Sequence, residues 1–220
     1  MMKIIKENKA FFIPYLILLV IAFYWIMTTS KLDQMKWINA FSNPGGFQFF
    51  YYITLSAEGT VWTILICLLL FIRFDWAIIA ILSVTISSLF TQFLKLSVFP
   101  DFLRPIAFFK DQPYHWELMN GLFMNEYNSF PSGHTTSAFA SYTLIAIMVK
   151  NKKAGFLFIT LAFLTGFSRP YLFQHFPEDV LAGAVIGSLS SVLIFYLMTS
   201  LFDKYPQKWY LRNLSNLSGK

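Results

Sequence analysis

The sequence predicts an all-α polytopic membrane protein, a bundle of six transmembrane helices with an interfacial loop and helix segment on its outer face. Composition is the first observation: 56% of the 220 residues are hydrophobic and only 13% are charged, against about 25% charged residues in soluble proteins. Mean hydropathy is +0.56. The second is a series of charge-poor runs close to the ~20 residues that a helix needs to cross a bilayer. We expect one membrane-embedded domain, residues 1–220.

Six apolar runs are the expected spans, and they cover residues 10–29, 49–72, 76–94, 134–149, 154–167 and 180–202. The first run follows three lysines and has no charge over 21 residues, which is long for a signal peptide and favours an uncleaved helix. The fifth is short, so its last residues should lie at the membrane surface. The segment 95–130 is the longest stretch outside the spans, and its aromatic residues suit the headgroup region.

The distribution of Lys and Arg predicts the orientation. Six spans place both termini on one side, and that side holds 11 of the 17 basic residues. Positively charged loops favour the cytoplasm, so we expect cytoplasmic termini in a bacterial-type inner membrane. The segments 95–130 and 168–179 then share the periplasmic or exterior face.

Composition also limits the function classes. The net charge of +6 comes mostly from residues that flank apolar runs, so it marks topology, and we expect no nucleic-acid partner. Cys67 is the single cysteine; it excludes an intrachain disulfide, and we expect it to be buried in its apolar run. Three histidines without a carboxylate cluster predict neither a metal site nor a cofactor.

A predicted helix start near residue 132 is the first candidate for chemistry. Pro131-Ser132-Gly133-His134 breaks the preceding loop, and Ser132 is a suitable N-cap. A helix start directs free N–H groups and a positive dipole end at an anion, while Gly133 permits close backbone approach. His134 would then stand beside that anion, where it can pass a proton. A capped helix with an interfacial histidine is the alternative.

The stretch from Ser168 to Asp179 is the second candidate, because it places ionisable groups beside long apolar runs. Pro177 fits the first position of a helix, so Asp179 would lie in the first turn and reach back to His175. A carboxylate on one imidazole nitrogen leaves the other unprotonated, as in an oriented base or nucleophile. A simple surface His–Asp hydrogen bond is the alternative.

Cations complete the expected site. Arg104, Arg169 and Lys95 carry positive charge to the same face, and guanidinium groups match phosphate oxygens. Two histidines with separate roles and two or three cations describe a metal-free phosphoryl-transfer site.

These three clusters together resemble the signature of the type-2 phosphatidic acid phosphatase superfamily. Its members include membrane lipid phosphate phosphatases and relatives of vanadate haloperoxidases and glucose-6-phosphatase. Pro-Ser-Gly-His at 131–134 and Ser-Arg, five residues, His, three residues, Asp at 168–179 match at every defined position. The first motif departs, because eight residues rather than six separate Lys95 from Arg104-Pro105. The resemblance covers about residues 50–202.

The resemblance implies a role for each matched residue. His175 would be the nucleophile that forms a phosphohistidine, with Asp179 orienting it, and His134 would be the general acid and later the base. The phosphate-binding residues would be Arg104, Arg169, Ser132, Gly133 and Lys95. Glu58 and Ser168 are candidates for supporting contacts, whereas His115 is expected in an interfacial belt, away from the substrate.

The expected function is therefore hydrolysis of a lipid-linked phosphate or pyrophosphate drawn from the bilayer. Candidate substrates from the family are undecaprenyl pyrophosphate, phosphatidylglycerol phosphate, phosphatidate and lipid A phosphates. Two alternatives stay open: a lipid phosphotransferase with the same intermediate, and a transporter or flippase that binds phosphate without chemistry. A vanadate haloperoxidase would use the same anion pocket, but those relatives are mostly soluble.

Overall fold

The computed structural model describes residues 1–216, which form helices joined by loops and contain no strand. The ten α-helices of this part are α1 Met2–Glu7, α2 Lys9–Thr28, α3 Lys31–Asn39, α4 Pro44–Leu55, α5 Gly59–Leu70, α6 Phe74–Phe93, α7 Pro105–Phe108, α8 Gly133–Met148, α9 Gly155–Tyr171 and α10 Pro177–Lys204. A π-helix, η1 Leu94–Val98, continues α6, and short 3₁₀ helices are η2 Lys152–Ala154, η3 Lys208–Leu211 and η4 Leu214–Asn216. The expected all-α class is confirmed.

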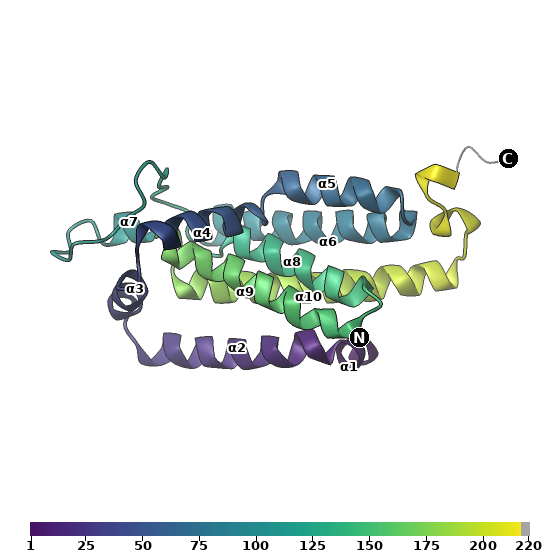
Figure 1. Cartoon of the computed structure of the whole chain (residues 1–220), viewed down its shortest axis with the longest axis horizontal. Coiled ribbons are helices and arrows are strands. Elements are labelled where there is room, and N and C mark those ends of the chain that lie inside the picture. The colour runs from purple at the N-terminus through teal and green to yellow at the C-terminus, as the bar shows by residue number, and fades with distance from the viewer. Residues whose placement is uncertain (217–220) are drawn as a thin grey trace.

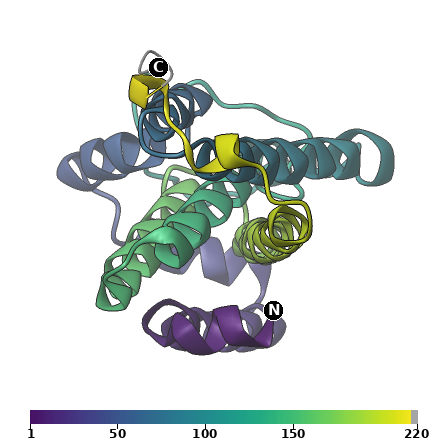
Figure 2. The same ribbon diagram turned by 90° about the vertical axis from the view of Figure 1, so that its right-hand side faces the viewer.

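The long helices run roughly along one axis and give the molecule two distinct ends (Figure 1). The left-hand end of that view holds α3, α7 and the long loops around α7, whereas α1 and the C-terminal 3₁₀ turns lie toward the right-hand end. Figure 2 looks at the right-hand end and shows the chain after α10 passing over the α5–α6 region. That passage is fixed by hydrogen bonds from the Phe74 N–H to the Arg212 carbonyl at 3.0 Å and from Asn213 Nδ2 to the Ile72 carbonyl at 3.4 Å.

Some, but not all, of the six expected spans are helices long enough to cross a membrane. Within residues 1–216, α2, the α6–η1 unit and α10 are long and apolar enough to cross a bilayer, and α4 with α5 makes a fourth if this pair, bent by 44°, counts as one span. The helices α8 and α9 have 16 and 17 residues. All six apolar runs fall mainly in helices, the run 49–72 in the two helices α4 and α5, and α8 and α9 are shorter than α2, α6 and α10.

The closest helix seam lies between α8 and α10, and two glycines make it close. A Cβ added to Gly183 would lie 2.7 Å from the Ser132 carbonyl oxygen, and one added to Gly187 would lie 2.3 Å from that of Thr136. Small residues let helix backbones approach in this way inside a membrane. Across the same seam, Ser191 Oγ donates a hydrogen bond to the Ala140 carbonyl at 2.6 Å. The two glycines of the last apolar run therefore let α8 and α10 pack backbone to backbone.

Two local expectations, the single span 49–72 and the burial of Cys67, were wrong. The run 49–72 was expected as one span, but it breaks between Leu55 and Gly59, where a short turn separates α4 from α5. The connection after the first span contains the helix α3, whose start is capped by Ser30 Oγ accepting from the Asp33 N–H at 3.1 Å. Cys67 is exposed rather than buried, because it lies on a face of α5 that no other described helix covers.

Aromatic packing holds the loops of the left-hand end together. Phe109, Phe173 and Phe176 are buried in a cluster with the half-buried Trp116. A pair of hydrogen bonds ties α3 to the same loops, because Asn39 Nδ2 donates to the Glu117 carbonyl at 2.7 Å and Asn39 Oδ1 accepts from the Glu117 N–H at 3.0 Å. These contacts fix the loop that carries residues 104–130 over the starts of α8 and α10.

Candidate active site

A His–Asp pair stands where α10 begins. Pro177 is the first residue of α10, as the sequence predicts, and Asp179 lies in its first turn. Asp179 Oδ2 lies 3.2 Å from His175 Nδ1 and accepts a hydrogen bond from the Phe176 N–H at 2.9 Å. Because an ionised carboxylate can only accept, the ring proton belongs on Nδ1, and Nε2 keeps a free lone pair.

His175 sits in the loop between α9 and α10 and is 1% exposed. Burial is the main reason that the pKa of this imidazole is held well below its usual value, and the positive charges of Arg104, Arg169 and Lys95 lower it further. Desolvation and nearby cations both disfavour the imidazolium form. The neutral ring, with its lone pair on Nε2, is therefore the form that the site maintains.

The start of α8 faces the start of α10. Ser132 is the N-cap of α8, as predicted, with its Oγ 3.4 Å from the Thr135 N–H and 2.9 Å from Thr135 Oγ1. Gly133 and His134 are the first two residues of the helix, and both are half-buried. The Ser132 N–H donates to the Asp179 carbonyl at 3.0 Å, so the two helix starts are directly joined. Their free N–H groups and dipole ends favour an anion between them.

Arg169 lies in the last turn of α9 and is 6% exposed. The fifth span was expected to end at residue 167, but α9 continues to Tyr171, so this arginine is helical. Its Nη1 donates to Thr54 Oγ1 of α4 at 2.9 Å, and its Nε is buried without a partner within residues 1–216. A buried guanidinium N–H without a partner is a donor available to an anionic ligand.

Arg104 reaches the same place from the loop before α7. Its Nε donates to the Tyr127 carbonyl at 3.0 Å, and its Nη1 lies 3.3 Å from Gln174 Oε1 and 3.4 Å from the Gln174 carbonyl oxygen. These acceptors come from the loop before α8 and from the loop before α10. The guanidinium of Arg104 is thus fixed between the two segments that carry the histidines.

Lys95 is buried in η1, and its Nζ donates to the Asn128 carbonyl at 2.7 Å and to the Ser129 carbonyl at 3.5 Å. Its side chain runs beside the start of α8, because a Cβ on Gly133 would lie 4.0 Å from Lys95 Cε. A π-helical turn holds one residue more than an α-helical turn. This geometry and the turn around Pro100 accommodate the long spacing from Lys95 to Arg104.

A cavity of about 230 Å³ opens among these groups. Of the predicted residues, Arg104, Arg169, His134 and Glu58 line it. The remaining wall residues are Tyr51, Thr54, Leu55, Leu122, Phe123, Asn125, Leu172 and Gln174. His175, Asp179, Ser132, Gly133 and Lys95 do not line this cavity; they lie in the packed layer next to it, where His175 follows the wall residue Gln174 in the chain.

The other predicted residues take three different positions. Glu58 is an exposed residue at the α4–α5 break and lines the cavity. Ser168 is fully buried, and its Oγ donates to the Thr165 carbonyl at 2.6 Å, so it braces α9 beside Arg169. His115 has a side chain that is 91% exposed, with Nε2 3.9 Å from Glu117 Oε1, and it does not line the cavity.

Sequence reasoning missed three residues of the site. Ser129 Oγ donates to Asp179 Oδ2 at 2.5 Å and lies 3.5 Å from His175 Nδ1. Thr54 holds Arg169, and Gln174 contacts Arg104. The position of Gln174 directly before the histidine was a usable signal, whereas Ser129 and Thr54 come from loops or helices whose proximity no spacing reveals.

Cationic side chains supply the positive charge that this site offers. Among residues 1–216, no three His, Cys, Asp or Glu side chains come close enough together to hold a metal ion. Arg104, Arg169 and Lys95 instead surround the two histidines, and all three act on His175 electrostatically. The geometry therefore gathers the positive charge of three side chains around the two histidines.

The fold and this site define a bundle of apolar helices that holds a small cavity with cationic side chains beside an oriented histidine. The PAP2 superfamily matches residues 76–203, which is more than half of the chain. The protein belongs to the PAP2 superfamily, and the resemblance read from the three motifs is confirmed.

Two curated relatives match part of the chain. The bacitracin transport permease protein BcrC of Bacillus licheniformis is 40% identical over 90 residues, which cover 37% of this chain and 43% of that protein. The undecaprenyl-diphosphatase BcrC of Bacillus subtilis is 33% identical over 96 residues, covering 43% of this chain and 49% of the relative. The matched region thus spans less than half the length of either relative.

A solved structure matches over a longer stretch. The crystal structure of LpxE from Aquifex aeolicus superposes with a TM-score of 0.66 at 28% sequence identity, covering 78% of this chain and 98% of that one. The likeness extends beyond the signature motifs to the bundle that carries them.

Proposed function

We propose that the protein is an integral membrane phosphatase that hydrolyses a lipid-linked phosphate or pyrophosphate. One observation carries the proposal: a cavity of about 230 Å³ lined by Arg104, Arg169 and His134 lies next to the buried His175–Asp179 pair. Membership of the PAP2 superfamily supports it, as does the relative named an undecaprenyl-diphosphatase.

In the first step, Nε2 of His175 attacks phosphorus. A P–N bond forms while the P–O bond to the leaving group breaks. His134, which the negative charge of the bound phosphate keeps protonated at this stage, gives a proton to the leaving oxygen. Asp179 Oδ2 stabilises the positive charge that develops on the ring, through the Nδ1 contact of 3.2 Å. Arg104 and Arg169 bind the equatorial oxygens, where negative charge concentrates.

In the second step, water attacks the phosphohistidine. His134, now neutral, takes a proton from that water, the P–N bond breaks, and the electron pair returns to Nε2 of His175. Inorganic phosphate leaves and the original protonation states are restored. The N–H groups at the start of α8, together with Lys95 beside Gly133, add positive potential to this end of the bundle.

The proposed arrangement in the membrane has six spans in one domain, with α4 and α5 as a single bent crossing. The termini are cytoplasmic and the cavity faces the exterior of a bacterial inner membrane, in line with the distribution of basic residues. The lipid tail stays in the bilayer while the headgroup enters the cavity from the side. Undecaprenyl pyrophosphate, phosphatidylglycerol phosphate, phosphatidate and lipid A phosphates are the candidate substrates.

The test is release of inorganic phosphate by the purified protein from each candidate lipid, with and without EDTA. We expect release from at least one lipid, and we expect it to persist in EDTA because the proposed charge comes from arginines and lysine. Activity that EDTA removes and Mg²⁺ restores would contradict the metal-free mechanism. Absence of turnover on every lipid would contradict the function.

Two other outcomes have distinct signatures. A phosphotransferase would move labelled phosphate to an alcohol acceptor without free phosphate. A transporter is favoured by the name of one relative, a bacitracin transport permease protein; it would leave the lipid intact, and transport would survive the substitution His175→Ala.

A further inference from the structure

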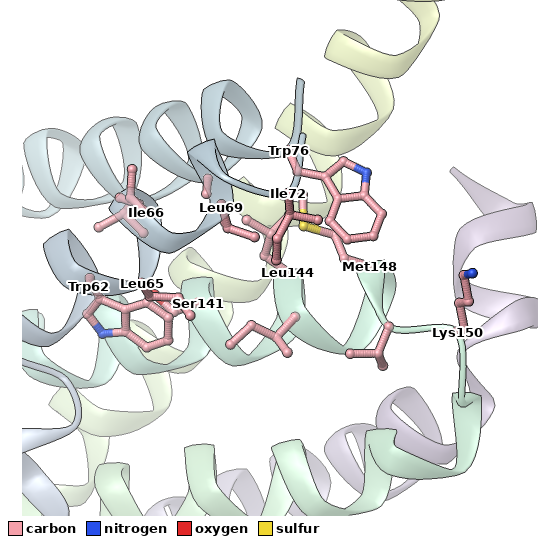
Figure 3. Close-up of a pocket in the computed structure, with 14 residues that line it drawn as sticks. Trp62, Leu65, Ile66, Leu69, Ile72, Trp76, Ser141, Leu144, Met148 and Lys150 are labelled. Carbon is pink, nitrogen blue, oxygen red and sulfur yellow. The ribbon is translucent and has the colours of Figure 1, made fainter. Parts of the chain in front are cut away.

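A second cavity, of about 320 Å³, lies between α5, α6 and the C-terminal half of α8, away from the helix start that carries His134. Its volume is in the range of ligand pockets, and apolar side chains make almost all of its wall. Figure 3 shows Trp62 and Ser141 at one end of the cavity, Trp76 and Met148 at the other, and Lys150 beyond them. The cavity is thus an apolar slot with a basic residue at its mouth.

The surroundings of the mouth are basic. Lys150 is exposed and has no ion-pair partner within residues 1–216. Lys153 is exposed on the same short connection between α8 and α9. Arg73, on the turn before α6, stacks over the ring of Trp76 at 5.4 Å and pairs with Asp75. An occupant that complements this site has an apolar chain and an anionic head.

We propose that this cavity binds one acyl chain of an anionic phospholipid, whose phosphate pairs with Lys150. The apolar wall takes the chain out of the bulk lipid, and the tryptophan near the mouth sits where the headgroup meets the hydrocarbon. Juxtamembrane lysines attract anionic lipids in the same way at membrane surfaces. The site is separate from the proposed catalytic cavity and does not depend on it.

Tryptophan fluorescence tests this site directly, because Trp62 and Trp76 line it. The probes are phosphatidylglycerol and phosphatidylcholine with brominated acyl chains, added to the purified protein in mixed micelles. The fluorescence of Trp76 is obtained by subtracting the fluorescence of the variant Trp76→Phe from that of the unmodified protein. We expect brominated phosphatidylglycerol to quench this signal at a lower mole fraction than phosphatidylcholine.

Matched variants distinguish lipid binding in this cavity from a general attraction of anionic lipid to the basic surface of the protein. Lys150→Gln should weaken the preference for phosphatidylglycerol about fivefold, as expected for one basic residue at an anionic surface, while Lys153→Gln should keep it. Val84→Phe, which narrows the cavity, should reduce quenching by both lipids. Two results would overturn the proposal: equal quenching by the two lipids in the unmodified protein, or an equal loss of the preference for phosphatidylglycerol in Lys150→Gln and Lys153→Gln. Either result would mean that the tryptophan meets only the bulk lipid.

Ser129 supports a second inference, which rests on the proposed function. Its side chain is 1% exposed, and its hydroxyl donates to Asp179 Oδ2 at 2.5 Å, the same oxygen that contacts His175 and the Phe176 N–H. The other oxygen, Asp179 Oδ1, is buried and has no partner within residues 1–216. All the contacts that orient this carboxylate therefore meet on one atom.

The geometry points to Ser129 as a positioning residue that holds Asp179 Oδ2 against His175 Nδ1. Without this hydroxyl the carboxylate can turn its unpartnered oxygen toward the histidine and lose its alignment. The proton of the His175 ring would then no longer be held on Nδ1, and the lone pair would no longer be fixed on Nε2.

The substitution Ser129→Ala should lower kcat about 10- to 150-fold, the range for losing a hydrogen bond to a charged group, with KM unchanged. Ser83→Ala is the matched control, because Ser83 is buried and its hydroxyl has no partner within residues 1–216. Ser129→Thr should restore part of kcat. Equal effects of Ser129→Ala and Ser83→Ala would overturn the role.

A readout without turnover keeps this inference separate from the proposed function. In ¹⁵N NMR, the ring of His175 should be the Nδ1–H tautomer in the unmodified protein and a mixture in Ser129→Ala. An unchanged tautomer in Ser129→Ala would overturn the positioning role, even if phosphate release were observed. A protein that shows the tautomer change but no turnover would contradict only the phosphatase.

Discussion

The two cavities of this bundle lie at opposite ends of one helix and differ in the groups that surround them. His134, the second residue of α8, lines the polar cavity, and Met148, the last residue of α8, lines the apolar one. At ~1.5 Å per residue these positions are ~21 Å apart. Buried ionisable groups at the polar end are expensive, whereas the apolar end is built of side chains that lipid itself would accept. The difference teaches that the polar end gains little stability from its buried charges, as the proposed binding and chemistry at that end require.

Substitution of the two histidines at the polar end is expected to give the largest loss of rate. His175→Ala removes the proposed nucleophile and should lower the rate on the order of 10⁴-fold or more, as for other covalent catalysts. His134→Ala should cost about 10²- to 10⁴-fold, the usual contribution of a general acid. Steady-state phosphate release measures both.

The exposed His115 provides the control for these two substitutions. His115→Ala should leave the rate unchanged, because this side chain is 91% exposed and lies outside the cavity. A rate loss for His115→Ala as large as that for His134→Ala would remove the distinction between the two histidines.

Arg169 of α9 provides a second comparison between the polar end and the apolar cavity. Arg169→Gln should reduce kcat/KM about 10- to 150-fold, the range for losing hydrogen bonds to a charged group. Arg169→Lys keeps the charge but loses the planar fork, so it should recover only part of this loss. The rate of Leu69→Ala, in the wall of the apolar cavity, should stay near that of the unmodified protein. Equal losses in Leu69→Ala and Arg169→Gln would contradict the assignment of the two ends.

Acid should destabilise the polar end through His175. The folded pKa of this histidine lies below its unfolded value of about 6.5. The unfolded chain therefore binds the proton first, and stability is complete above that pH and falls as the pH drops below it. This group therefore makes the folded protein less stable as the pH falls from 7.5 to 5. The thermal unfolding midpoint of the unmodified protein should fall more steeply over this range than that of His175→Gln, and parallel pH curves would contradict the assignment.

The glycine seam between the two ends should show a smaller effect. In Gly187→Ala the new Cβ would lie 2.3 Å from the Thr136 carbonyl oxygen, so the backbones of α8 and α10 must separate. Overpacking of this kind costs about 1–3 kcal/mol. Thermal unfolding should detect the loss, and Gly59→Ala, where an added Cβ meets nothing within 4 Å, is the matched control. Equal shifts in the two variants would show that the seam is not close-packed.

The sequence predicted the helical class and the contacts that depend on local spacing. His175 and Asp179 are four residues apart across a helix start that Pro177 marks, so their contact follows from local geometry. The capping role of Ser132 was predictable for the same reason. In contrast, the bend between Leu55 and Gly59 was missed, because the run reads as one apolar segment although its halves pack against different helices, α4 against α9 and α5 against α6. The exposure of Cys67 depends on which helix face stays uncovered, which composition does not reveal.

Contacts between distant segments were beyond the sequence. Ser129 meets Asp179 across 50 positions, and Thr54 meets Arg169 across 115. The predicted topology placed Arg104, His134 and His175 at one membrane face, and the joint resemblance of the three motifs to a family assigned them to one site. The sequence also did not show that the His175–Asp179 pair lies outside the cavity wall, which only the structure reveals.

The most direct test of the account is capture of the phosphorylated enzyme. The purified protein is mixed with a ³²P-labelled lipid phosphate that it hydrolyses, quenched in alkali within milliseconds, digested and mapped by mass spectrometry. The account predicts an alkali-stable, acid-labile phosphate on His175 that is absent from His175→Ala and accumulates in His134→Ala. Turnover without any label on His175, or label on another residue, would contradict it.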